Sequence, residues 1–251
     1  MRAAQCAVLA LVCLAGLPAF GTSDPRAGAF TKLPDWRGIW IAEGHDAGIS
    51  GFSTSGGPTA KVFKLIDLQA PWTDAARARL LEVFNGSGAR KAQGWGYPMM
   101  MDAYAPIQFV ITPEEVLITN SYHEVRQIYT DGRSHPKEED RWATTWGDSV
   151  GHWEGDTLVI DTIAVRDPTR YFIVAPPLSE EAHYVERLRK MGADRIEAEF
   201  TIEDTVTLTR PWTVKTAYIR APNLDRLVPD AFENDRSEVE GDAFGIRPPK
   251  D

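Results

Sequence analysis

The sequence predicts a mainly β protein that forms one antiparallel β-barrel with a single short helix and long N-terminal loops. Two β-hairpin signals lie between Ile107 and Thr162, and further runs of alternating residues continue as far as Arg220. No low-complexity linker, internal repeat or long block of charge divides residues 22–251, a length that suits one large β domain. We therefore expect a single barrel domain over these residues.

The first hairpin signal joins Phe109–Thr112 to Val116–Tyr129, two runs rich in β-branched and aromatic residues that flank a Pro-Glu-Glu break. Side chains alternate between the two faces of a strand, so a single strand over Val116–Tyr129 places a mixed polar row on one face. That row consists of Ile118, Asn120, Tyr122, Glu124, Arg126 and Ile128. Two interpretations stay open: the row faces solvent, or it lines a polar cavity if the sheet closes into a barrel.

The second hairpin signal consists of Ser149–Trp153 and Thr157–Thr162, which flank the short glycine-containing turn Glu154-Gly155-Asp156. Between the two hairpins, Thr130–Pro136 combines a turn dipeptide, a cation, a histidine and a proline. We expect the function to reside in this region.

The short helix is predicted to begin after the N-cap residue Thr73 and to end at Asn85-Gly86. The loop before it contains His45-Asp46, which is more often solvated than ligand-binding. Further strands are predicted over residues 182–189, 196–202, 206–209 and 212–220. Residues 221–251 are expected to form an irregular acidic tail.

The first 21 residues are predicted to be a secretory signal peptide. They combine a basic start at Arg2, an apolar segment over Ala7–Leu17 that is too short to span a bilayer, and the small-x-small site Ala19-Phe20-Gly21. Both cysteines, Cys6 and Cys13, lie inside this segment. The mature chain is therefore expected in the periplasm or outside the cell, without disulfides.

Composition argues against several classes of partner and cofactor. The formal net charge is −9 and the charges are scattered, so nucleic acid and anionic membranes are poor candidate partners. After the signal peptide, no apolar stretch is long enough for a transmembrane helix. The histidine spacing does not suit zinc, and the sequence contains no phosphate-binding loop and no Gly-x-Ser-x-Gly elbow. We expect no metal and no cofactor, and the oligomeric state is left open.

Gly38-Ile39-Trp40, at the start of the first expected strand, is similar to the Gly-x-Trp signature of lipocalin-type barrels. The resemblance implies that the tryptophan plugs one end of the barrel and that an arginine of the last strand lies over it. Arg220 is expected to supply that cation–π contact. The alternative is a buried tryptophan at an ordinary strand start.

Four sequence blocks together resemble a large family of secreted bacterial proteins, most of them uncharacterised. The blocks are Arg126-Gln127-Ile128, Asp131-Gly132-Arg133-x-His135-Pro136, Ser149-Val150-Gly151-x-Trp153-Glu154-Gly155-Asp156-Thr157-Leu158-Val159 and Pro211-Trp212-Thr213-Val214. The resemblance covers Pro34 to Val214 and implies export, but no general activity. Members of the family usually carry a Cys-Pro-Pro-Gly-like segment where this chain has Gly94-Trp95-Gly96-Tyr97-Pro98, so no thiol chemistry is expected.

Acid–base chemistry without a cofactor is the candidate mechanism, because histidines and polar side chains gather in the central region. A histidine beside a carboxylate suits a general base, and a buried arginine can hold a developing negative charge. The candidate catalytic residues are Arg126, His135, His123, Tyr122 and Glu124. The candidate ligand-binding residues are Asn120, Trp146, Asp148, His152, His183 and Met100. Each histidine taken alone is more often structural, and the three consecutive methionines around Met100 more often fill a core.

Three function classes follow. The favoured one is a cofactor-independent lyase or isomerase acting on a small aromatic or hydrophobic molecule in a barrel pocket, with a histidine base assisted by Arg126 and Tyr122. The second is a carrier that binds such a hydrophobic ligand without chemistry and needs mainly an apolar lining. The third is an interaction module that exposes tryptophans, for which the mixed polar row would be solvated.

Overall fold

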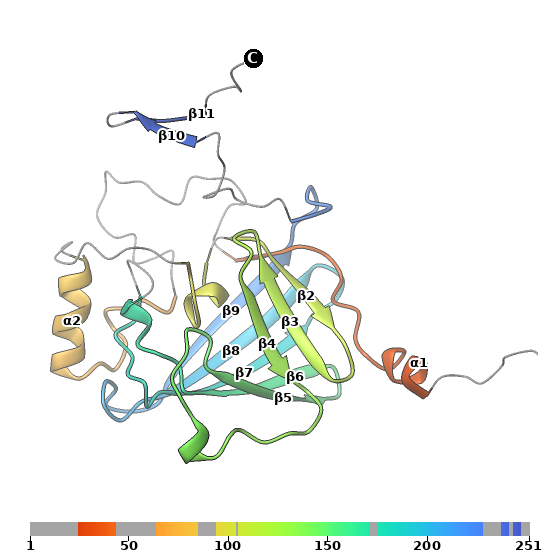
Figure 1. Ribbon diagram of the computed structural model, residues 1–251, viewed down its shortest axis with the longest axis horizontal. Helices are drawn as coiled ribbons and strands as arrows, with labels where there is room; N and C mark the ends of the chain where they lie inside the picture. The colour runs from red at the N-terminus through yellow and green to blue at the C-terminus, as the bar shows by residue number, and fades with distance from the viewer. Residues whose placement is uncertain are drawn as a thin grey trace, which may run out of the picture.

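Nine strands close into one barrel in the computed structural model, which describes residues 25–43, 64–84, 94–103, 105–170, 175–227, 237–240 and 243–246 (Figure 1). The barrel strands are β1 (Trp40–Ala42), β2 (Ile107–Ile111), β3 (Glu115–Asn120), β4 (Val125–Tyr129), β5 (Asp148–Glu154), β6 (Thr157–Ile163), β7 (His183–Lys190), β8 (Arg195–Glu203) and β9 (Trp212–Arg220). The mainly β barrel fold is confirmed. The predicted signal peptide, His45-Asp46 and Asn85-Gly86 lie outside the described residues.

Short helices and a separate hairpin complete the described chain. They are α1 (Pro25–Phe30), α2 (Asp74–Phe84), the 3-10 helices η1 (Met99–Met101), η2 (Glu138–Asp140) and η3 (Pro168–Arg170), and the paired strands β10 (Ser237–Glu240) and β11 (Ala243–Ile246). The tail was expected to be irregular, and this β10–β11 hairpin corrects that expectation. Among the described residues, no helix combines the length and the apolar character needed to span a membrane.

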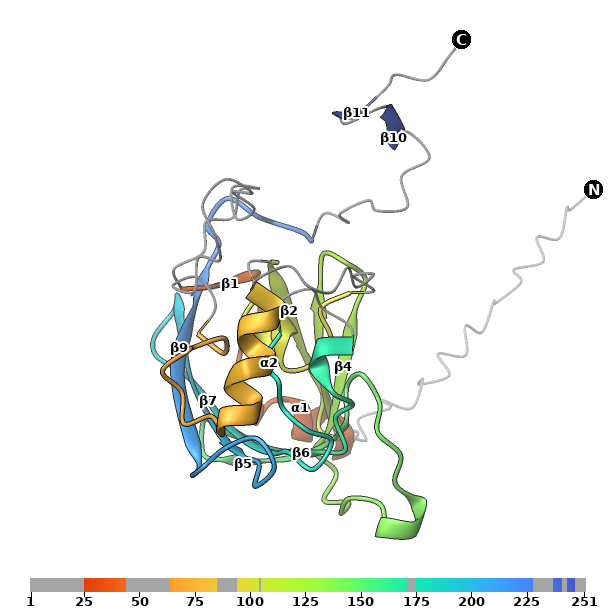
Figure 2. The same cartoon turned by 90° about the vertical axis from the view of Figure 1, so that its left-hand side faces the viewer.

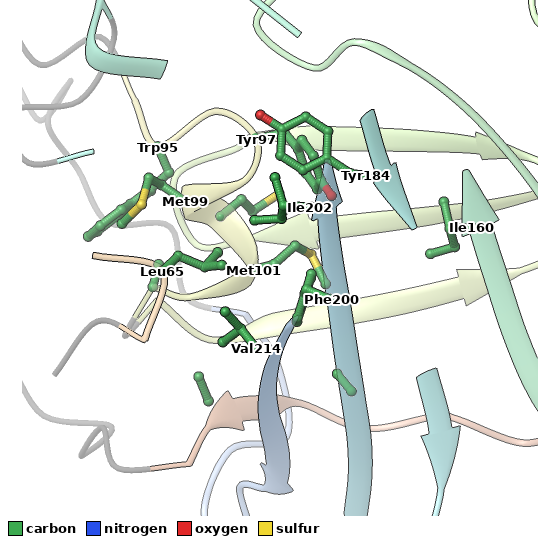
Figure 3. Packing of buried hydrophobic residues seen from close by; sticks show 14 of the residues in the cluster. Leu65, Trp95, Tyr97, Met99, Met101, Ile160, Tyr184, Phe200, Ile202 and Val214 are labelled. Atoms are coloured by element: carbon green, nitrogen blue, oxygen red, sulfur yellow. The ribbon is translucent and has the colours of Figure 1, made fainter. Parts of the chain in front are cut away.

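Strand alternation decides which side chains fill the barrel. In β8, Ile196, Ala198, Phe200 and Ile202 are buried, while the acidic residues between them point outward. The same period of two applies to β2, β3, β4 and β7, as expected for a sheet with one apolar face. The interior is a packed core, in which Tyr97 and η1 lie among side chains of several strands (Figure 3).

One pair of neighbouring strands departs from the antiparallel prediction. β4 and β5 run parallel, and in the described chain they share one paired position, Tyr129 with Val150. We call this junction the seam. Parallel neighbours need a connection that returns the chain to the starting end, and residues 130–147 form it by crossing below β5 and β6 (Figure 1). We call these residues the crossing loop.

The strand predicted over Val116–Tyr129 is two strands, so this prediction was wrong. A tight turn over residues 121–124 separates β3 from β4, and His123 adopts a left-handed backbone conformation with φ of 60°. The turn preserves the alternation, because Ile118 and Arg126 are register partners and both point inward. The strand residues of the mixed row therefore point into the barrel, whereas Tyr122 and Glu124 lie in the turn.

α2 covers one end of the barrel, which Figure 2 views nearly along its axis. Ala76 and Leu80 on its inner side are buried. The segment before it is fixed to the loop before β9, since Trp72 pairs with Leu208. Residues 206–209, which were predicted to be a strand, form a turn with this single bridge instead.

The start of α2 provides a test of the helix prediction. The Thr73 side chain accepts a hydrogen bond from the amide of Ala76 at 3.3 Å, as expected for an N-cap. Thr73→Ala is expected to lower the free energy of unfolding by about 1 kcal/mol, measured by urea denaturation. Thr73→Ser keeps the hydroxyl group and serves as the control; an equal loss in both variants would contradict the capping role.

The opposite end of the barrel is closed by Trp36. Its ring packs edge to face against Phe109 at 5.2 Å and Trp153 at 5.4 Å between centroids.

Trp40 is also fully buried, as the lipocalin resemblance implied. The cation nearest its ring is Lys190, at 5.9 Å, and Arg220 instead lies against Gly38, so the role expected of Arg220 is corrected. Lipocalin barrels have eight antiparallel strands, whereas this barrel has nine and one parallel seam.

Candidate functional site

The predicted polar row contains a fully buried ion pair inside the barrel. Arg126 of β4 makes a two-point contact with Glu186 of β7, in which Nη1 donates to Oε1 at 3.1 Å and Nη2 donates to Oε2. Nη2 also donates to Thr162 at 3.0 Å and to Ser149 at 3.4 Å. Burial lowers the pKa of Arg126, but the charge of Glu186 acts in the opposite direction, and the net shift is upward. Arg126 therefore stays charged and already has a counterion.

An aromatic side chain covers the guanidinium group of Arg126. Its central carbon lies 4.1 Å from the centroid of the Tyr97 ring, which in turn packs edge to face on Tyr184 (Figure 3). Burial, followed by the charge of Glu186, raises the pKa of the Tyr97 hydroxyl group well above its usual value. This tyrosine is therefore a neutral hydrogen-bonding group near neutral pH.

Glu124 and Asn120 of the predicted row lie at the β3–β4 turn and make hydrogen bonds there. Glu124 accepts hydrogen bonds from the amides of Trp95 and Gly96 at 2.7 and 3.2 Å, and from the Asn120 side chain at 2.6 Å. Asn120 in turn accepts from the amides of Tyr122 and Glu124. These contacts hold the β3–β4 turn against the segment that begins at residue 94.

A second polar group lies on the outer face of the barrel wall, and we define it as the His–Asp cluster: His135, Asp148, Asp161 and His183. Nδ1 of His135 lies 2.5 Å from Asp148 Oδ1, and its Nε2 lies 3.0 Å from Asp161 Oδ1. Nε2 of His183 lies 2.9 Å from the same Asp161 oxygen. All four side chains are partly exposed. The cluster therefore joins the crossing loop to β5, β6 and β7.

The two histidines of the cluster differ in what their ring nitrogens contact. Both nitrogens of His135 face carboxylate oxygens, so the ring has no nitrogen left for a further partner. His183 uses Nε2 for Asp161, while its Nδ1 lies 3.8 Å from Glu203 Oε2, beyond hydrogen-bond distance. An imidazole held by a carboxylate at one nitrogen, with the other nitrogen available, is the usual arrangement of a general base.

The remaining predicted residues are not brought together with either group. His123 is exposed at the β3–β4 turn, and His152 is exposed on β5 with its Nε2 3.3 Å from Glu154. Trp146 is half buried and packs against the core, where Met100 is fully buried. None of the four described histidines is buried, so Arg126 and the histidines lie on opposite faces of the wall.

Sequence reasoning missed Glu186 and Asp161, although both carried a signal. Glu186 lies on the same face of β7 as the apolar residues Tyr184 and Leu188. A carboxylate on the buried face of a strand indicates a buried partner. Asp161 lies on the outward face of a predicted strand, between the buried residues Ile160 and Thr162. Its link to His135, far away in sequence, had no local signal.

A further buried carboxyl group lies outside both groups. Asp102, 3% exposed, follows η1 and accepts a hydrogen bond from the amide of Leu65 at 2.6 Å. Burial raises the pKa of Asp102 to about 7, against the lowering effect of the backbone hydrogen bonds. This carboxyl group fastens the segment before α2 to the barrel interior.

A surface hollow of about 550 Å³ lies on the outer face of β7–β9, away from the His–Asp cluster. Three of its cations already pair with carboxylates: Arg187 with Glu154, Arg195 with Glu43, and Lys215 with Glu199. Paired charges of this kind are typical of a solvated surface. Among the described residues, no group of three or more His, Cys, Asp or Glu side chains is arranged to hold a metal ion.

Comparison with known proteins leaves the family open. No family model matches this sequence, and no curated protein matches it. The resemblance to secreted bacterial proteins therefore stays a prediction.

Proposed function

We propose that the protein is an exported, cofactor-independent lyase or isomerase that moves a proton on a small aromatic or hydrophobic molecule. His183 acts as the general base. Asp161 orients its ring by accepting a hydrogen bond from Nε2, and Nδ1 exchanges the proton with the substrate.

The contact between His183 and Asp161 carries this proposal. A carboxylate that accepts from one imidazole nitrogen fixes both the ring orientation and the tautomer, so the second nitrogen presents a lone pair. Asp161 also contacts His135, which is held on its other side by Asp148. The shared carboxylate is thereby fixed from two directions, which favours a single orientation of His183.

The crossing loop, which supplies His135 to the cluster, also offers a surface for an aromatic substrate. Trp142 lies in the crossing loop and is 74% exposed. Its neighbours are tied down, since Arg141 donates to the carbonyl of Pro136 at 2.7 Å and Arg166 donates to the carbonyl of Ala143 at 2.8 Å. An exposed indole on an anchored loop offers a flat surface for stacking.

Deuterium incorporation tests the proposed proton transfer. The purified protein is incubated with a small-molecule extract of its own periplasm in D2O, and mass spectrometry identifies compounds that gain deuterium. The wild type is expected to label one or a few compounds, and His183→Gln is expected to reduce this rate at least about 100-fold. His152→Gln is the matched control, because His152 also contacts a carboxylate on the outer face.

Two outcomes would contradict the proposal. Equal labelling by the wild type and His183→Gln would remove His183 as the base. Loss of labelling in His152→Gln as well would indicate a general effect on the barrel. A bound molecule that co-purifies but never exchanges a proton would favour the alternative function, a carrier of a hydrophobic ligand, for which the apolar barrel interior is the supporting feature.

A further inference from the structure

The seam is one of two junctions of the barrel wall that rest on a single paired position in the described chain; the other joins β1 to β2. β5–β9 are joined by continuous ladders of seven, six, eight and eight paired positions, whereas in the described chain β4 and β5 share the single pair Tyr129 and Val150. Few ladder hydrogen bonds hold this junction, so separation of the wall there costs less backbone pairing than separation between any two strands from β5 to β9.

Side chains take over the role of the missing ladder. On the inside, Arg126 of β4 reaches across the seam to Ser149 of β5, Thr162 of β6 and Glu186 of β7. On the outside, His135 of the crossing loop lies between Asp148 of β5 and Asp161 of β6. The seam is thus closed by two side-chain latches, one on each face, and both depend on single residues.

The interior next to the seam contains hydrogen-bonding atoms without partners. Nε of Arg126 and the hydroxyl group of Tyr184 are buried, and neither makes a hydrogen bond. Such buried groups are rare and call for a ligand or water that satisfies them. Glu186 already neutralises Arg126, so a neutral acceptor fits this position better than a second carboxylate.

The lining at this position can rearrange. Met99, Met100 and Met101 of η1 are fully buried in the same core, and Figure 3 shows Met99 and Met101 among its apolar side chains. The hydroxyl group of Tyr218 donates to the carbonyl of Met101 at 2.6 Å. Methionine side chains are unbranched and repack around guests of different shape. A small apolar molecule therefore has a deformable lining to displace.

We propose that the barrel opens at the seam and admits an apolar molecule with a neutral hydroxyl or carbonyl group, which accepts a hydrogen bond from Nε of Arg126. The two latches control the entrance. This interior site goes beyond the proposed reaction, because His183 takes no part in it, and either proposal can fail without the other.

Probe binding tests the interior site. Affinities for 1-naphthol, naphthalene and 1-naphthoate are measured by fluorescence on the full chain. We expect 1-naphthol to bind about tenfold more tightly than naphthalene, and 1-naphthoate to bind more weakly than 1-naphthol. Arg126→Lys keeps a cation opposite Glu186 and removes the Nε donor, so it should lose the preference for 1-naphthol and keep the affinity for naphthalene. Ser149→Ala is the control and should keep the preference.

A disulfide across the seam tests the entrance without removing any latch. Cysteines replace Tyr129 and Val150 in a chain that also carries Cys6→Ser and Cys13→Ser, and the matched control places them at Val185 and Thr201, register partners of the β7–β8 ladder. Oxidation of the seam pair should slow 1-naphthol binding at least about tenfold, with recovery on reduction, and oxidation of the control pair should not. Unchanged binding in the oxidised seam variant would overturn the entrance. Failure of every probe to bind, or equal affinity for 1-naphthol and naphthalene, would overturn the site.

Amide hydrogen exchange measures the opening directly. β4 and β5 should exchange faster than β7 and β8 in the wild type, and His135→Asn should accelerate exchange at β4 and β5 alone. Lys137→Ala changes the same loop at an exposed side chain and should have no such effect. Equal protection of β4 and β8 in the wild type would contradict an opening at the seam.

Discussion

Replacing Arg126 by methionine is expected to lower the free energy of unfolding by about 3–5 kcal/mol, the largest effect of any single change considered for this protein. The substitution leaves Glu186 charged, fully buried and without its counterion. It also removes the donor shared by Ser149 and Thr162. Urea denaturation followed by circular dichroism gives the difference in free energy.

A double variant separates the cost of the unpaired charge from the loss of packing. Arg126→Met combined with Glu186→Met removes both charges and keeps similar volume, and replacement of a buried ion pair by apolar residues is often neutral or stabilising. We expect the double variant to recover most of the stability lost in Arg126→Met. If the double variant is as unstable as the single one, the ion pair itself is not the cause.

The wild type is expected to lose up to about 4 kcal/mol of stability through Asp102 alone as the pH rises from about 4 to 7. The pKa of Asp102 is about 7 in the folded protein, above the ordinary value of 3.8 that applies to the unfolded chain. Between these values the folded state binds a proton that the unfolded state has released, so the slope of stability with pH is negative. The stabilising contribution is complete below the unfolded pKa and is lost as the pH rises through the folded pKa.

Asp102→Asn isolates this effect, because an amide keeps an acceptor oxygen for the Leu65 amide and does not titrate. Other carboxyl groups, such as those of Glu43 and Asp131, have lowered pKa values and lose stability in acid instead, so the measured quantity is the difference between variant and wild type. In thermal unfolding from pH 4 to 8, the stability of Asp102→Asn relative to the wild type should increase as the pH rises. A constant difference would contradict the raised pKa of Asp102.

The fold could be predicted wherever the alternation of residues is local. β8 and the β5–β6 hairpin follow directly from alternating apolar residues and from the glycine of the turn, where Gly155 has a φ of 64°. The β3–β4 turn could not be predicted, because His123 adopts the left-handed conformation without glycine. Its support comes from the Asn120 side chain, which accepts hydrogen bonds from two turn amides.

The candidate site likewise contains residues with a local sequence signal and contacts without one. Arg126 was expected to matter because it lies in a row of polar residues whose orientation stayed open, and the structure buries it inside the barrel. Its partner Glu186 had a comparable local signal. By contrast, the parallel seam depends on how the crossing loop returns the chain, and the contact of His135 with Asp161 depends on that path. Neither follows from local sequence patterns, since both result from tertiary packing.

The short strand β1 has a consequence for the order of folding. All three of its residues pair with β9, where Trp40 is opposite Arg220, and Trp40 also pairs with Ile107 of β2, so β1 joins β2 to the last strand of the barrel. Contacts between such distant parts of a chain are costly in loop-closure entropy and form slowly. The hairpins from β5 to β9 can form from nearby residues, so β1 is expected to join the barrel last, and the barrel closes as a circle only in that final step.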